Sequence, residues 1–105
     1  MALEPASASA TSALTHALDV SSERHSLLAR NLANLNTPGY TRMDLEFESA
    51  LRDQAGPPAA HAEASGSPSL VKETGAMASN DAFYVSCTRL LQLDFQARHA
   101  ALKDR

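Results

Sequence analysis

The chain has 105 residues and a formal net charge of −3, and 44% of its residues are hydrophobic but only 5% are aromatic. This length predicts a single domain, residues 1–105, with a thin core, because few large apolar side chains are present to fill it. The acidic balance argues against a nucleic-acid partner bound through its phosphates, and no apolar run approaches the roughly 20 residues that a transmembrane helix needs.

The N-terminal part predicts a flexible lead-in followed by a long helix. Residues 1–10 are small and polar and lack the basic and apolar regions of a Sec signal, so we expect any export to use another route. Over residues 11–36, positions spaced alternately four and three apart form an a/d heptad seam, which needs a partner helix. These positions are Leu14, Leu18, Ser21, His25, Leu28, Leu32 and Leu35.

A proline–glycine turn is expected to end this helix. Pro38 disfavours helical backbone at Thr37, and Gly39 tolerates the positive φ that a type II turn requires at its third position. Asparagines before the turn can hydrogen-bond the backbone groups that a helix end leaves unpaired. The residues predicted to form this corner are Asn31, Asn34, Thr37, Pro38, Gly39 and Tyr40.

Residues 37–53 combine the turn with a short segment that has two interpretations. Asp44 fits the N-cap of a short helix from residue 45 to about residue 53. The alternation of Met43, Leu45 and Phe47 with acidic residues is instead typical of a strand. We favour the helix, because residues 50–52 continue the helical pattern.

The rest of the chain predicts a linker and a second long helix. Residues 54–79 hold three of the five prolines and three of the four glycines, the composition of a flexible loop, with an extended piece at 70–72. Asn80 or Asp81 is then expected to cap a C-terminal helix over 80–103. Its apolar stripe consists of Tyr84, Leu91, Phe95 and Leu102. We therefore predict a mainly α-helical fold in which the two long helices pair antiparallel in a coiled-coil-like manner.

Residues that could support chemistry do not form a recognisable set. His16, Asp19 and Glu23 share one side of the first helix, but nothing nearby completes a metal shell, and a solvated polar face explains them better. Cys87 and His99 lie on one predicted helix, about 18 Å apart along its axis, too far for a nucleophile–base pair. We expect no catalytic residue, no metal, no cofactor and no enzymatic activity.

The stretch at residues 28–40, Leu-Ala-Arg-Asn-Leu-Ala-Asn-Leu-Asn-Thr-Pro-Gly-Tyr, resembles the N-terminal signature ANNxANxxTPGY of bacterial flagellar axial proteins. Rod, hook and hook-junction subunits share that signature. The short chain, the segment at residues 42–51 and the Phe-Gln-Ala stretch at 95–97 are similar to the proximal rod (FlgB) branch of this family.

This resemblance implies a structural subunit of the flagellar basal-body rod, exported by the flagellar type III apparatus and assembled with other rod proteins in the periplasm. It also implies that the two terminal helices pair, and that their seam holds Leu14, Leu18, Leu28, Leu32 and Leu35 against Tyr84, Leu91, Phe95 and Leu102. Two alternatives stay open. One is another axial subunit, of the distal rod or related to the hook, and the other is a soluble helical-hairpin adaptor or chaperone.

Overall fold

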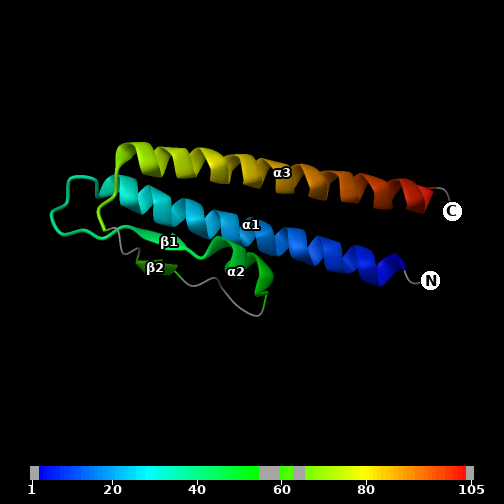
Figure 1. The fold of residues 1–105 in the computed structure, drawn as a ribbon. Helices are drawn as coiled ribbons and strands as arrows, with labels where there is room; N and C mark the ends of the chain where they lie inside the picture. Colours follow the sequence, from blue (N-terminus) through cyan, green and yellow to red (C-terminus); the bar gives the residue numbers. More distant parts are fainter. Residues whose placement is uncertain (1–2, 55–59, 63–65, 104–105) are drawn as a thin grey trace.

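The computed structural model describes residues 3–54, 60–62 and 66–103, and the protein is mainly helical. Its elements in chain order are α1 (Leu3–Ala33), β1 (Met43–Leu45), α2 (Phe47–Arg52), β2 (Ala60–Ala62) and α3 (Leu70–Lys103). Figure 1 shows α1 and α3 side by side and antiparallel, with both termini at the same end of the hairpin. The radius of gyration is 17.4 Å, against about 13 Å for a compact domain of this size. The predicted antiparallel helix pair is confirmed, and the molecule is elongated.

The central element is α1, which has α3 on one side and the β1–α2 layer on the other (Figure 1). β1 and β2 form a two-stranded antiparallel ribbon whose backbone register pairs residue 44 with residue 61. The main apolar cluster lies between α1 and the β1–α2 layer. It contains Val20, Leu27, Leu45 and Ala50, with Met43, Phe47 and Leu51 packed against it and partly buried.

Aromatic and polar contacts hold the short helix α2 in place. The Phe47 ring of α2 meets the Phe83 ring of α3 edge to face, with the centroids 5.0 Å apart. The guanidinium of Arg24 lies over the Phe47 ring, 5.3 Å from its centroid. On the other flank, His16 Nε2 lies 2.6 Å from the Ala50 carbonyl oxygen. Both long helices therefore contribute to the position of α2.

The predicted boundaries of the long helices were partly wrong. The helix α1 begins at Leu3 and includes most of the expected lead-in, since the first helical turn accepts a proline such as Pro5. It ends at Ala33, before residue 36. The helix α3 begins ten residues before the expected position, at Leu70, so Asn80 and Asp81 are interior residues rather than caps.

The start of α3 has its own cap and a buried anchor. The backbone N–H of Lys72 donates to Ser69 Oγ at 3.1 Å, and the N–H of Glu73 donates to the Ser69 carbonyl at 2.9 Å. Ser69 is therefore the N-cap, and the buried Glu73 side chain holds the first turn against the rest of the molecule. Residues 70–72 are helical and not extended, and 70–79 are not linker. Of the remaining linker prediction, residues 55–59 and 63–65 lie outside the described part of the chain.

Residues 43–52 combine both interpretations of that segment. Residues 43–45 form β1, and the helix α2 begins at Phe47 after Glu46. Asp44 is not an N-cap, because its carboxylate accepts hydrogen bonds from Arg24 and from the Leu45 N–H inside the strand. The pairing with β2 explains why the alternating pattern formed a strand here.

Candidate functional site

The corner after α1 has the geometry that its sequence predicted. The Tyr40 N–H donates to the Thr37 carbonyl at 3.2 Å, and Gly39 has a φ of +77°. This bond and this positive φ are the marks of a turn with Pro38 and Gly39 at its centre. Figure 1 shows the corner at the end of the hairpin opposite the two termini, and Thr37, Pro38 and Gly39 are exposed there.

Asn34 closes the end of α1, as predicted for the asparagines. Its Nδ2 donates to the Arg30 carbonyl at 2.9 Å, and its Oδ1 accepts from the Thr37 hydroxyl at 3.0 Å. The backbone tightens at the same place, where the Asn34 N–H donates to the Asn31 carbonyl three residues earlier. The Asn34 side chain therefore joins the last turn of α1 to Thr37, the first residue of the proline–glycine turn.

Asn31 has a different role, because its amide binds the chain that returns from the corner. Its Nδ2 donates to the Met43 carbonyl at 2.8 Å, and its Oδ1 accepts the Met43 N–H at 3.0 Å, so the side chain pairs with β1 as a neighbouring strand would. Nδ2 also donates to Glu73 Oε1, and Oδ1 accepts from the Tyr40 hydroxyl. All four hydrogen-bonding capacities of this fully buried amide are used.

A buried ion pair connects the same strand to α3. Arg42 donates from Nε to Glu73 Oε2 at 2.8 Å and from a terminal nitrogen to Glu73 Oε1 at 2.9 Å. The backbone N–H of Arg42 also donates to the Gly66 carbonyl. Arg42 is 1% exposed and Glu73 is fully buried, and the guanidinium fork matches the carboxylate in a bidentate contact. The hydrogen bonds from Arg42 lower the pKa of Glu73 below its usual value, against the opposing effect of burial.

A second bidentate pair continues the network through Asp44 of β1, whose carboxylate also lies 3.8 Å from the Arg42 guanidinium. Arg24 of α1 donates to both carboxylate oxygens of Asp44, at 2.9 and 3.1 Å. Burial raises the pKa of Asp44, but the hydrogen bonds from Arg24 and the Leu45 N–H and the charges of Arg24 and Arg42 together hold it below its usual value. The two arginines and the two carboxylates balance in charge, so the strand after the corner is fixed by a neutral network.

Polar residues also form much of the contact between α1 and α3. Four α3 residues recur every seventh position, and three of them bind α1. Glu73 accepts from Asn31, Asn80 exchanges hydrogen bonds with Ser21, and Asp94 accepts from the Thr11 hydroxyl at 2.8 Å. The fourth is Cys87, which is buried. Polar side chains at such positions fix the register of paired helices.

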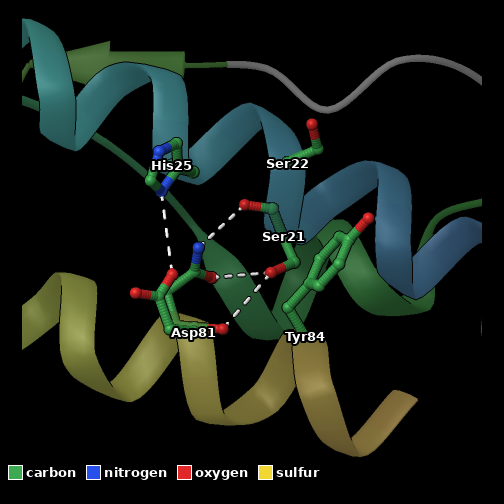
Figure 2. Close-up of a pocket in the computed structure, with 6 residues that line it drawn as sticks. Ser21, Ser22, His25, Asp81 and Tyr84 are labelled. Carbon is green, nitrogen blue, oxygen red and sulfur yellow. Dashed lines mark hydrogen bonds and ion pairs between the residues drawn. The ribbon is translucent and has the colours of Figure 1, made fainter. Parts of the chain in front are cut away.

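A shallow recess between α1 and α3 places a serine, a histidine and an aspartate near one another (Figure 2). His25 Nδ1 lies 3.8 Å from Asp81 Oδ1, but the buried Ser21 hydroxyl donates to Asn80 and not to His25. A nucleophile needs a hydrogen bond to its base, so this arrangement is a helix–helix contact and not a catalytic triad. Figure 2 shows the Tyr84 side chain rising from α3 beside Ser21.

The residues of the predicted helix-pairing seam differ in burial, and those on α3 are mostly exposed. Leu28 is fully buried, while Leu14, Leu18, Leu32 and Leu35 are only partly buried. On α3, Leu91 is partly buried, but Tyr84, Phe95 and Leu102 are 42%, 59% and 65% exposed. The polar residues at seven-residue spacing face α1 instead, because their hydrogen-bonding groups need partners there, and the apolar stripe lies on the neighbouring face.

Arg42, Glu73, Asp44 and Arg24 were not predicted as site residues. Their pairing joins parts of the chain that are far apart in sequence, and charges alone do not reveal it. Two signals were present: the seven-residue repeat that includes Glu73 and Asn80, and an arginine in the first residues after the turn.

No protein-family model and no curated protein matches the chain. Within residues 3–54, 60–62 and 66–103, no three histidine, cysteine or acidic side chains are grouped so that they could hold a metal ion. No helix in that part of the chain has an apolar stretch long enough to cross a membrane.

Proposed function

We propose that this chain is a structural subunit of the bacterial flagellar rod, of the proximal type, which assembles with other rod proteins after type III export. The observation that carries the proposal is the stretch at residues 28–40, which resembles the axial signature. Three residues of that stretch have distinct parts in the corner: Asn34 closes the helix, Gly39 turns the chain, and Asn31 fixes the returning strand.

The geometry suits a subunit that presents its corner to neighbours. The exposed residues 37–39 stand at one end of the hairpin, and the buried network behind them ties that end to both long helices. A pre-organised end of this kind loses little entropy when a neighbour binds it. Function then depends on shape, which agrees with a site that contains hydrogen-bonded anchors rather than a reactive group.

The test is a strain from which the gene is deleted, scored by electron microscopy of isolated basal bodies and by swimming. We expect no complete rods, and restoration by the wild-type gene and by a Gly75→Ala control, since Gly75 lies in α3 with open space around it. Gly39→Ala should restore export but impair assembly. A deletion strain with complete rods would refute the proposal.

A further inference from the structure

The helix α3 has a second heptad seam that the chain itself covers only in part, since Thr88, Leu91 and Arg98 are partly buried and Arg98 donates to the Thr11 hydroxyl of α1. All eight exposed large hydrophobic residues among the described side chains belong to α3, and three of them, Tyr84, Phe95 and Leu102, lie on this seam. In Figure 1 this helix has α1 along one side, while β1 and α2 lie beyond α1. We define the second seam as the residues at alternating spacings of four and three on the face next to α1. They are Tyr84, Thr88, Leu91, Phe95, Arg98 and Leu102.

A helix with two adjacent heptad seams is typical of a bundle of more than two helices, because each seam buries against a different partner. The first seam of α3, with Asn80 and Cys87, is buried against α1. Around Phe95 and Leu102 the second seam forms a broad, open depression whose margin includes His99 and Lys103. A third helix placed along this face would bury the stripe.

The order of residues in the second seam makes it complementary to itself when two copies run antiparallel. Tyr84 of one copy then lies opposite Leu102 of the other, and Leu91 lies opposite Phe95. The polar layer also pairs with itself, with Thr88 opposite Arg98. Every large apolar side chain therefore meets another, which is what a two-fold, isologous contact requires.

Charge selects the same direction. In the antiparallel arrangement, the exposed Asp81 at one end of the seam lies beside Lys103 of the other copy. In a parallel arrangement, Asp81 would face Asp81 of the other copy and Lys103 would face Lys103, and these like-charge contacts are unfavourable. From the apolar stripe, its palindromic order and this charge pattern, we infer that α3 binds α3 of a second copy antiparallel, giving a closed dimer with a four-helix core.

The dimer is a property of the free chain and is separate from the proposed function. An isologous contact closes on itself and cannot propagate, so it covers the second seam of chains that are outside any larger assembly. The seam spans residues 84–102, about 27 Å of helix, which is short for a stable interface. We therefore expect a weak dimer that dissociates on dilution.

The first experiment measures the molar mass of the full chain by light scattering over a wide dilution series. We expect twice the monomer mass at high concentration and the monomer mass on dilution. Phe95→Glu should remove the dimer, whereas Leu93→Glu should keep it. Leu93 is a matched control, because it is 54% exposed against 59% for Phe95 and lies outside the second seam. Circular dichroism checks that both variants stay helical.

The second experiment tests direction with single cysteines in a Cys87→Ala background. Gln92 flanks the seam next to the two-fold axis, so Gln92→Cys should form an intermolecular disulfide on mild oxidation. Asp81→Cys should not, because in the antiparallel dimer the two copies of this position lie at opposite ends. A chain that stays monomeric, equal loss of dimer in both glutamate variants, open-ended polymers, or efficient crosslinking through Asp81→Cys would each overturn the inference. None of these results depends on whether the gene is needed for rods.

Discussion

Removing the Glu73 carboxylate should be among the most damaging single changes in the protein. Glu73→Ala leaves Arg42 with its guanidinium buried and without its bidentate partner, and it removes one acceptor from Asn31. Breaking one side of a buried ion pair costs about 3–5 kcal/mol, because the remaining charge cannot be solvated. Since small domains have only about 5–15 kcal/mol of stability, this loss is a large fraction of the total.

The assay is urea unfolding followed by circular dichroism, with Glu48→Ala as the control. Glu48 is an exposed glutamate on α2, so its removal should change the free energy of unfolding by less than about 0.5 kcal/mol. The double variant Arg42→Met/Glu73→Leu should recover much of the loss, because apolar residues of similar size replace buried pairs at little cost. If Glu73→Ala is too unstable to titrate, a folded double variant still identifies the loss of the Glu73 carboxylate beside a buried Arg42 as the cause. A single variant within about 1 kcal/mol of wild type would refute the buried pair.

Three further outcomes are expected. Gly39→Ala should cost about 1–2 kcal/mol in urea unfolding, because its φ of +77° is strained for alanine, whereas Gly75→Ala in open space within α3 should stabilise by about 0.5–1 kcal/mol; equal effects would contradict the turn. The pKa values of Glu73 and Asp44 in the folded protein lie below their usual 4.5 and 3.8. The stability that these carboxylates contribute is therefore present above the usual pKa values and is lost as the pH falls through the folded-state pKa values. Melting temperatures measured over an acid pH series should show this loss as a decline that starts below pH 4.5. Burial raises the pKa of the Cys87 thiol, so alkylation of the folded chain, followed by mass spectrometry, should be far slower than in urea; equal rates would show that the thiol is not covered.

Local rules were enough to predict the corner. Pro38 disfavours helical backbone at Thr37, and Gly39 allows a positive φ. Both effects act within four residues and require no knowledge of the rest of the fold. The closing bond from Asn34 to the Arg30 carbonyl is equally local. The antiparallel helix pair also followed, because a long helix with an apolar stripe must be covered and only one other long helix was expected.

Contacts between distant segments explain what the sequence did not predict. Residues 70–79 have a composition that suggests a linker, yet they are helical, since Glu73 is held by Arg42 and by Asn31. The apolar core was misplaced for a related reason. Val20 and Leu27 lie outside the a/d seam of the first helix, and they became core residues only when β1 and α2 folded back over them.

The polar residues that recur every seventh position on α3 account for the error about its partner. An apolar stripe can pack against any apolar surface, whereas Asn80 satisfies its hydrogen bonds only opposite Ser21, and Asp94 only opposite Thr11. The side of α3 that carries these polar residues therefore packs against α1. A buried polar group without a hydrogen bond would cost more free energy than an exposed leucine or phenylalanine. The apolar face, with Phe95 at its centre, then remains for a contact between chains.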